Sequence, residues 1–398
     1  MTIFIPKGYR FSAVYAGLKS DPSLFDLSLL VSDFPASASG VFTNNAVCGA
    51  PVTFDRRYVP CEGMRCVVAN ARYANACTGE QGLRDVEEIA DFVSNAICGE
   101  TGKTLIMSTG VIGVCLPMDK IRKGLDELLK RLELSADSFV NFAKGIMTTD
   151  TVEKYVTKQL KLESGEIITI AGICKGAAMI APHLATMLAV VLTDAAIDCN
   201  DSQKLLAAAA ENSFNAISVE GHTSTSDTLI LLANGAAVSR KLTGNDLTKF
   251  ANCLNELCVE LALKILSDGE GVTHLITIKV EECKDVESAK TIARKVGEDV
   301  LVKTAIAGAD PNWGRVISAI GTSGVDFDLK KLSFYLNGFE LFRNGEPQNF
   351  NKNIVSDSIR NNRETSFKIT LNQGDKKTIF WTTDLTMEYV RLNSDYTT

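Results

Sequence analysis

The sequence has 398 residues, of which 45% are hydrophobic and 22% are charged, and its formal net charge is −7. This balance is typical of a globular protein with two or three hydrophobic cores. Nucleic-acid binding requires clustered basic side chains, and because the sequence contains no such cluster we exclude a nucleic-acid partner.

The amino-terminal segment lacks the basic stretch and long apolar run of a signal peptide. The apolar runs, such as Met187–Leu192, fall well short of the roughly 18 residues expected for a membrane helix. We therefore expect a cytoplasmic protein with no membrane partner. The eleven cysteines are scattered and form no CxxC pair, which indicates free thiols and no metal site.

Short runs rich in β-branched and apolar residues predict strands, and helical stretches lie between them. This alternation indicates a mixed α/β architecture. The predicted strands are Cys66–Val68, Thr104–Met107, Ile167–Ile170 and Leu275–Val280.

Helices are predicted at Val86–Ile97, Met118–Leu132 and Leu247–Leu266, the last two with apolar residues along one face that should cover a sheet. The segment Gly99–Thr104 ends like a phosphate-binding loop. That motif requires a glycine where this chain has Ile97, and it should follow a strand, so we do not predict nucleotide binding here.

The carboxyl-terminal segment Ser366–Tyr396 alternates apolar and polar residues around Asn372–Asp375. This pattern is typical of a hairpin, so the chain is predicted to end inside a sheet.

Acyl chemistry requires a nucleophile and a base. His183, His222 and His274 lie in no recognisable nucleophile motif, so we do not expect a histidine base. The segment Lys175–Leu188 has two interpretations. It is either a loop that enters a buried strand or a self-cleavage segment that contains the start of a second chain. In the second reading, cutting between Ala185 and Thr186 frees an α-amine of pKa about 7.7 to 8.0 that serves as the base for its own hydroxyl.

An oxyanion needs hydrogen-bond donors, and Ser108–Gly113 directly after a predicted strand offers a threonine hydroxyl and a glycine amide. A turn of this kind is also commonplace. Further polar clusters each read as capping or turn segments, and Asp310–Trp313 is predicted to begin a helix before Val316–Ile320. These clusters are Met147–Thr151, Thr223–Thr228, Ser267–Gly271 and Asp310–Arg315.

Taken in chain order, these segments resemble the glutamate N-acetyltransferase family, also called ornithine acetyltransferases. The resemblance covers nearly the whole chain, and the ATML and DPNWGR motifs together are highly specific. The motifs include GVFT at 40–43, ANACTG at 74–79, STGVIG at 108–113, MTTDT at 147–151, ATML at 185–188, SDGEG at 267–271, LVKTA at 301–305 and DPNWGR at 310–315.

The resemblance implies a layered mixed-sheet α/β fold that cuts itself into two interleaved chains, an alpha chain of residues 1–185 and a beta chain of residues 186–398. It implies an assembly of two alpha and two beta chains. It also implies site residues: Thr186 as nucleophile, Ala185–Thr186 as cleavage point, Thr109 and Gly110 as oxyanion hole, and Thr149, Lys175, Glu270, Asn393 and Thr398 as substrate contacts.

The implied activity is acetyl transfer from N2-acetyl-L-ornithine to L-glutamate through an acetyl-Thr186 ester, in arginine biosynthesis. It needs no metal or organic cofactor. The sequence does not decide whether acetyl-coenzyme A also serves as an acetyl donor. Opposite charges at Lys175 and Glu270 suit a zwitterionic amino acid.

Three places depart from the family pattern and leave open a paralogue that acts on a related acetylated amino acid. They are Arg72 with Tyr73, Glu220 with His222, and Lys295–Val300. A self-processing aminopeptidase or amidase is the alternative enzyme, and a catalytically silent binding protein is the alternative without chemistry.

Overall fold

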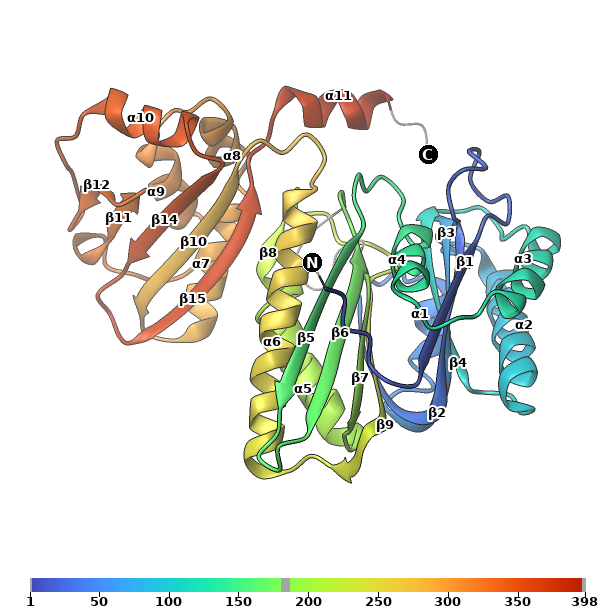
Figure 1. Cartoon of the computed structure of the whole chain (residues 1–398). Coiled ribbons are helices and arrows are strands. Elements are labelled where there is room, and N and C mark those ends of the chain that lie inside the picture. Colours follow the sequence, from blue (N-terminus) through green and yellow to red (C-terminus); the bar gives the residue numbers. More distant parts are fainter. Residues whose placement is uncertain (1, 180–186, 396–398) are drawn as a thin grey trace. The chain divides into compact units, whose positions relative to one another are not determined.

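The computed structural model describes residues 2–179 and 187–395 and divides into two compact units (Figure 1). Unit 1 comprises the chain up to residue 215 together with 222–265, and unit 2 comprises 216–221 and the chain from 266. The chain thus enters unit 2 at residues 216–221, returns to unit 1, and enters unit 2 again at residue 266. These units do not coincide with the alpha and beta chains expected from a cut at Ala185–Thr186.

Unit 1 is built on an eight-stranded mixed sheet with strand order β4-β3-β2-β9-β7-β6-β5, and β1 pairs with β2. Its strands are β1 (Tyr9–Val14), β2 (Leu27–Phe42), β3 (Cys61–Tyr73), β4 (Thr104–Val111), β5 (Lys154–Lys161), β6 (Ile167–Lys175), β7 (Leu188–Ala196) and β9 (Thr228–Lys241). Its helices are α1 (Ala50–Asp55), α2 (Gly79–Cys98), α3 (Met118–Lys130), α4 (Ala136–Gly145), α5 (Cys199–Glu211) and α6 (Gly244–Ser267). A short 3₁₀ turn at Phe214–Ala216 follows α5.

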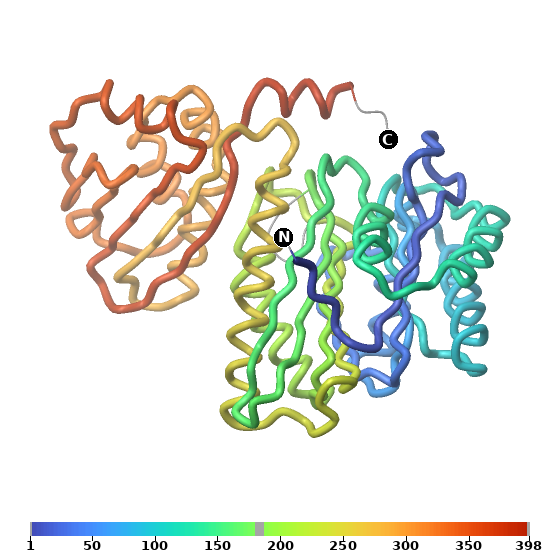
Figure 2. Tube along the Cα trace, in the orientation of Figure 1, coloured from blue at the N-terminus to red at the C-terminus, as the bar shows by residue number. Residues whose placement is uncertain are grey.

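Early and late segments of the chain alternate across this sheet. Strands β7 and β9, which follow residue 186, lie between β2 on one side and β6 on the other, both of which precede residue 185. The colour order of the trace in Figure 2 shows the same insertion. The sheet is therefore built from both sides of position 185, with the two later strands inserted between earlier ones.

Two apolar layers bury the faces of the unit 1 sheet. On one face, α4 packs Phe139 and Phe142 edge-on against Phe11 of β1, with ring centroids 5.3 and 6.1 Å apart. On the other, α3 buries Ile121 and Leu125 in a cluster that also contains residues of α1 and α2. The three predicted helices are confirmed, because one apolar face on each is buried against the sheet or its neighbours.

Unit 2 contains a seven-stranded mixed sheet with strand order β13-β12-β11-β14-β10-β15-β8. Its strands are β8 (Ile217–Ser218), β10 (Leu275–Cys283), β11 (Ser333–Leu336), β12 (Phe339–Arg343), β13 (Glu346–Pro347), β14 (Glu364–Thr370) and β15 (Lys376–Thr383). Its helices are α7 (Val286–Gly297), α8 (Val300–Ala307), α9 (Trp313–Gly321), α10 (Lys352–Arg360) and α11 (Met387–Asp395), with a 3₁₀ turn at Leu329–Lys331.

The predicted hairpin at the carboxyl end is wrong. Strands β14 and β15 are not paired with each other, because β10 lies between them, parallel to β14 and antiparallel to β15. The described chain also continues beyond the last strand of the sheet, since α11 follows β15. By contrast, the predicted helix start before Val316 is confirmed: α9 begins at Trp313, and the Asn312 side chain accepts the Arg315 N–H.

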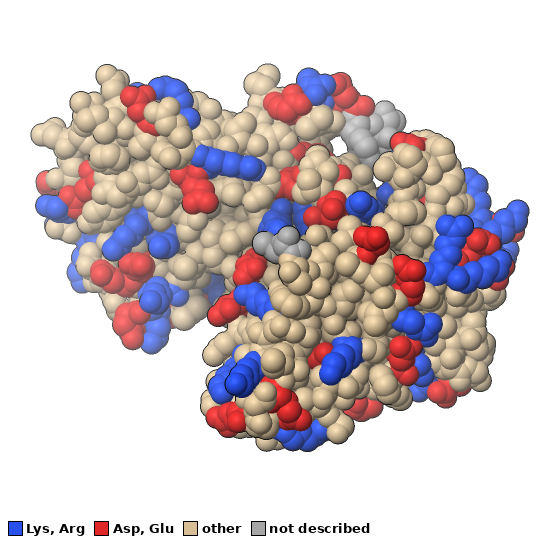
Figure 3. Space-filling model, viewed as in Figure 1, with Lys and Arg blue, Asp and Glu red and all other residues tan. Residues whose placement is uncertain are grey.

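Acidic and basic side chains are mixed over the face drawn in Figure 3. Arg122 of α3, for example, pairs with Glu88 at 2.6 Å and with Asp119 at 2.9 Å, all three being exposed. Exposed pairs of this kind add little stability. Within the ranges 2–179 and 187–395, no helix is long and apolar enough to cross a membrane.

Candidate active site

One row of residues crosses the strand ends of unit 1. Lys175 at the end of β6 is paired with Leu188 at the start of β7, and Leu188 is paired with Thr228 at the start of β9. Thr228 is paired in turn with Phe42 at the end of β2. The chain between Lys175 and Leu188, which carries the predicted cleavage point, thus begins and ends at the same edge of the sheet.

Lys175 places a buried ammonium group at this edge. The residue is 1% exposed. Its Nζ donates to Thr148 Oγ1 at 2.8 Å and lies 3.4 Å from Thr109 Oγ1. Because Thr109 lies near the end of β4, this contact joins two strands that are far apart in the strand order of the sheet.

Asp150 supplies negative charge next to this ammonium group and is fully buried. Its Oδ1 accepts Lys154 Nζ at 2.7 Å and Gly176 N at 2.6 Å, and its Oδ2 lies 3.9 Å from Lys175 Nζ. Burial alone would raise the pKa of Asp150, but the charges of Lys175 and Lys154 outweigh burial and lower it to about 2. The carboxylate is therefore ionised at neutral pH.

The predicted oxyanion segment begins inside a strand and not after it, because β4 extends to Val111, and its backbone at Gly110 is one that only glycine accommodates. Gly110 has φ +133°, and a Cβ there would lie 2.1 Å from the carbonyl carbon of Arg72. Arg72 itself has φ +96°. The departure from the family pattern at Arg72 and Tyr73 therefore directly adjoins this segment, while the neighbouring Thr109 side chain is buried.

Asp227 fixes the first described residue after the predicted cleavage point. Its Oδ1 accepts Met187 N at 3.1 Å, and Thr228 N donates to Met187 O at 3.1 Å, so both backbone groups of Met187 are held. Among the residues that the structure describes, none forms a hydrogen bond with the buried Asp227 Oδ2. Burial raises the pKa of Asp227 well above its ordinary value, although the Met187 N–H and the charge of Lys175 act in the opposite direction.

The predicted residues Ala185, Thr186 and Thr398 lie outside the described residues. Thr149 is half-buried in the bend between α4 and β5, directly between Thr148 and Asp150. His222 is exposed in unit 1.

In unit 2, the predicted substrate residues Glu270 and Asn393 contact each other. Asn393 Nδ2 of α11 donates to Glu270 Oε2 at 2.9 Å. The helix is held over this loop by Thr386, whose hydroxyl donates to Gly271 O at 2.7 Å. A Cβ on Gly271 would lie 2.4 Å from Tyr389 N, so the loop and the helix are in close contact.

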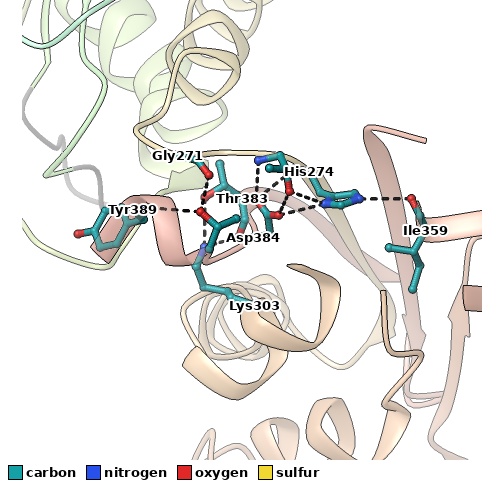
Figure 4. Close-up of polar contacts among 9 residues, drawn as sticks. Gly271, His274, Lys303, Ile359, Thr383, Asp384 and Tyr389 are labelled. Atoms are coloured by element: carbon teal, nitrogen blue, oxygen red, sulfur yellow. Dashed lines mark hydrogen bonds and ion pairs between the residues drawn. The ribbon is translucent and has the colours of Figure 1, made fainter. Parts of the chain in front are cut away.

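A second polar cluster in unit 2 is structural (Figure 4). Asp384 Oδ1 accepts the backbone N–H groups of Thr273 and His274, each at 3.0 Å, and its Oδ2 lies 3.0 Å from His274 Nδ1. Nearby, buried Lys303 donates to the backbone oxygen of Thr383, and burial lowers its pKa to about 8, although the charges of Asp384 and Glu220 act against that shift. These contacts join the end of β15 to α8 and to β10.

Three charged residues of the unit 1 site were missed in the sequence. Asp150 and Lys154 fall within or just after the cluster Met147–Thr151, and Asp227 falls within Thr223–Thr228, both of which were interpreted as capping or turn segments. A signal was present, because an acidic residue follows several hydroxyl residues in each cluster. The signal does not show that both carboxylates become fully buried.

Known proteins are similar to this chain over nearly its whole length. The sequence matches the model of the ArgJ family over residues 10–398. The arginine biosynthesis bifunctional protein ArgJ of Rhodopirellula baltica is 38% identical over 397 residues, which cover 99% of this chain and 96% of that protein. The protein of the same name from Dehalococcoides mccartyi is 40% identical over 400 residues, covering 100% and 97%.

A crystal structure of the arginine biosynthesis bifunctional protein argJ from Bacillus halodurans is similar in fold. It is 35% identical, with a TM-score of 0.51, and the match covers 52% of this chain and 98% of that chain. With a family match over nearly the whole length and relatives this similar end to end, this chain belongs to the ArgJ family.

Proposed function

We propose that this chain is a bifunctional acetyltransferase of arginine biosynthesis, which moves acetyl from N2-acetyl-L-ornithine to L-glutamate through an ester on Thr186 and also accepts acetyl-coenzyme A as donor. Family membership supports this activity. The observation that carries it in the structure is the buried ammonium of Lys175 beside the Thr109 hydroxyl, at the strand ends that flank the predicted cleavage point.

The first proposed step is self-cleavage. The Thr186 hydroxyl attacks the Ala185 carbonyl, the Ala185–Thr186 C–N bond breaks, and the hydroxyl proton moves to the departing nitrogen. Water then hydrolyses the resulting ester and leaves a free α-amine on Thr186. Asp227 supports this step by fixing Met187, because a fixed backbone next to the reacting residue limits the conformations that it must search.

The second proposed step is acetyl transfer. The α-amine of Thr186 takes the hydroxyl proton while the oxygen attacks the acetyl carbonyl, and the proton then passes to the ornithine nitrogen that leaves. Thr109 and Gly110 stabilise the oxyanion. The glutamate amine attacks the acetyl-Thr186 ester in the second half-reaction and restores the free threonine.

We assign Lys175 to the α-carboxylate that both substrates share, and Glu270 with Asn393 to their amine groups. The closeness of Lys175 to Thr109 supports a further effect of its charge on the oxyanion. A small activated acetyl ester tests the assignment. If Lys175 only binds substrate, Lys175→Ala should be acetylated by this ester about as fast as wild type, and if the variant is cut but not acetylated, Lys175 takes part in the chemistry.

The division into an alpha chain of residues 1–185 and a beta chain of residues 186–398 has two supports. Strands from both sides of the cut are hydrogen-bonded to one another in a single sheet, so this sheet would hold the two chains together after the cut. The crystallised Bacillus halodurans chain matches 52% of this chain over 98% of its own length, so it is about half as long. We further propose a cytoplasmic enzyme of two alpha and two beta chains.

The test is intact-mass measurement before and after incubation with N2-acetyl-L-ornithine. We expect two chains beginning at Met1 and Thr186, and one added acetyl group on the second chain only. Addition of L-glutamate should remove that group as N-acetylglutamate. An active protein that remains one chain would contradict the amine-as-base mechanism, and release of acetate without transfer would indicate an amidase instead.

A further inference from the structure

A pocket in unit 1 lies between the loop that follows β1 and helix α3, and the proposed mechanism does not use it. The loop and the helix are neighbours in the fold (Figure 1). The pocket, which we call the α3 pocket, has a volume of about 410 Å³, within the range of roughly 300 to 1,000 Å³ that small-molecule sites occupy. Its walls include Tyr15, Pro22 and Phe25 from the loop, and Lys120, Lys123 and Arg131 from α3 and the residue after it.

The loop wall of the α3 pocket is held in place by a buried carboxylate. Asp26 accepts the backbone N–H groups of Ala16 and Leu18, each at 2.6 Å, and that of Lys19 at 2.9 Å. The Tyr15 hydroxyl donates to Lys19 O at 3.2 Å, and the Tyr15 side chain remains exposed. A ligand that binds here therefore meets a wall that is already ordered, which lowers the entropic cost of binding.

Helix α3 is in direct contact with this loop beside the pocket. A Cβ on Gly124 would lie 2.8 Å from the Cβ of Ala16, and both residues line the pocket. Lys120 Nζ donates to Gly17 O at 2.7 Å. The contact between Gly124 and Ala16 thus closes one side of the pocket, while the lysine side chains of α3 form another.

The α3 pocket carries more positive than negative charge, although the whole chain has a net charge of −7. Its one acidic lining residue, Glu127, lies 3.5 Å from the Arg131 guanidinium. Lys120 is bound to a backbone carbonyl, which orients an ammonium without neutralising it. Lys123 is exposed and forms no ion pair with any residue in the described ranges 2–179 and 187–395. An anion is therefore the expected ligand.

The side chains of the pocket suit a ligand that carries both phosphate groups and a planar ring. Lysine and arginine bind phosphates by charge-assisted hydrogen bonds, and aromatic side chains such as Tyr15 and Phe25 stack on nucleotide bases. Among the proposed substrates, N2-acetyl-L-ornithine and L-glutamate have neither group. Acetyl-coenzyme A has both, because it ends in a phosphorylated adenosine.

The same loop adjoins the candidate active site. Lys19 Nζ donates to the backbone oxygen of Phe25 at 2.7 Å, so it is tied to a residue that lines the pocket. Burial lowers the pKa of Lys19, and the charges that act on it include those of Asp150 and Lys175 in the candidate active site. The loop thus faces the pocket through Phe25 and the active-site charges through Lys19.

We propose that the α3 pocket binds the nucleotide end of acetyl-coenzyme A, with its phosphates at Lys120 and Lys123 and its adenine ring against Tyr15. The acetyl thioester end would then extend along the loop toward the candidate active site. This inference rests on the proposed function, since it gives a place to the second acetyl donor. The two donors would share the nucleophile but not this pocket.

The first experiment titrates the full-length protein with adenosine 3′,5′-bisphosphate, which is the nucleotide end without the acetyl arm. Isothermal titration calorimetry should show saturable binding that weakens as ionic strength rises. The compound should inhibit acetyl transfer from acetyl-coenzyme A and leave transfer from N2-acetyl-L-ornithine unchanged. No binding, or equal inhibition of both reactions, would overturn the proposal.

The second experiment reverses one charge in the pocket. Lys123→Glu places a carboxylate next to the phosphates, so we expect KM for acetyl-coenzyme A to rise by roughly tenfold or more, whereas KM for N2-acetyl-L-ornithine should match wild type. Lys123→Arg keeps the charge and should retain most of the affinity. The matched control is Lys204→Glu on α5, which changes the net charge equally at an exposed position outside the pocket and should match wild type with both donors.

The third experiment tests the ring of Tyr15. Tyr15→Phe keeps the ring and Tyr15→Ala removes it, so KM for acetyl-coenzyme A should be higher in the alanine variant. An unchanged KM in both Lys123→Glu and Tyr15→Ala would overturn the proposal and leave the proposed function intact. If ADP also binds in wild type while these kinetics are unchanged, the pocket is a site for free nucleotides and the proposal is wrong.

The wild type separates this inference from the proposed function. A wild type that transfers acetyl from N2-acetyl-L-ornithine but not from acetyl-coenzyme A would disprove the second donor and the role of the α3 pocket together. A wild type that transfers acetyl from neither compound would contradict the proposed function itself.

Discussion

Thr109 contributes a hydroxyl that lies 3.4 Å from the ammonium of Lys175 and is buried at the end of β4. If this hydroxyl stabilises the oxyanion, Thr109→Ala should lower kcat by roughly 10²- to 10³-fold with a smaller change in KM. Steady-state kinetics of acetyl transfer measure this, and Thr109→Ser, which keeps the hydroxyl, should retain most of the rate. A near wild-type kcat for Thr109→Ala would remove the residue from the oxyanion hole.

Because Lys303 is buried, the stability of the protein should vary with pH in the alkaline range. Burial lowers its pKa to about 8 from an ordinary value near 10.5, so between these values the unfolded chain binds more protons than the folded one at this position. The contribution of Lys303 to stability should therefore become more favourable as pH rises through this window. We expect the melting temperature of wild type to rise relative to that of Lys303→Met from neutral pH to about pH 9.5, and a constant difference would contradict this.

The sequence indicates some of these residues and not others for a physical reason. Lys175 and Thr109 were assigned through the family resemblance, and the structure brings the two side chains together. Lys154 and Asp150 are only four residues apart, but their pairing depends on the bend that carries the chain from α4 into β5. Hydrogen bonds from Gly176 and Thr148 fix Asp150 in that bend, and neither bond is visible in residue spacing.

At the level of elements, the end of β4 at Gly110 is expected to be sensitive to a single methyl group. A Cβ at Gly110 would lie 2.1 Å from Arg72 backbone, whereas at Gly113, which also has a positive φ, a Cβ would meet nothing within 4 Å. Gly113→Ala carries a conformational cost of about 1 to 2 kcal/mol, whereas Gly110, with φ +133°, lies farther from any conformation that alanine adopts. Gly110→Ala should therefore melt at a clearly lower temperature than Gly113→Ala, and equal melting temperatures would show that the end of β4 adjusts freely.

Helix α11 gives a comparable prediction in unit 2. Gly271→Ala would place a Cβ 2.4 Å from Tyr389 N and should displace α11 from the loop that carries Glu270. The control is Gly324→Ala, another positive-φ glycine, where a Cβ would meet nothing within 4 Å. We expect Gly271→Ala to raise KM for N2-acetyl-L-ornithine while Gly324→Ala does not. An unchanged KM in both variants would show that α11 does not contribute to substrate binding.

Helices were predicted from sequence better than strand order was. The apolar face of α3 depends on residues three and four positions apart, so local spacing predicts it. The pairing of β14 and β15 depends on which distant strand enters between them, and β10 does so from about ninety positions earlier in the chain. A turn sequence at Asn372–Asp375 is compatible with both arrangements, and therefore it could not distinguish them.

At the scale of the whole molecule, the two proposed chains should stay together after cutting. Strands β7 and β9 lie between β2 and β6, with six register pairs between β6 and β7 alone. A tag at the amino terminus should therefore retain the chain beginning at Thr186 in native buffer and lose it in denaturant. Loss of that chain in native buffer would contradict the interleaved arrangement.

Because β7 lies between β6 and β9, the cut also determines whether folding involves one molecule or two. Before the cut, residues 176–187 tether β6 to β7, so their pairing is an intramolecular event at a high effective concentration. After the cut, the same pairing requires two separate molecules to meet, and its equilibrium then depends on protein concentration. Self-cleavage would thus turn a reversible folding reaction into a directional one. The uncut precursor can unfold and refold repeatedly. A cut molecule that unfolds in dilute solution no longer has the covalent connection that first brought its strands together.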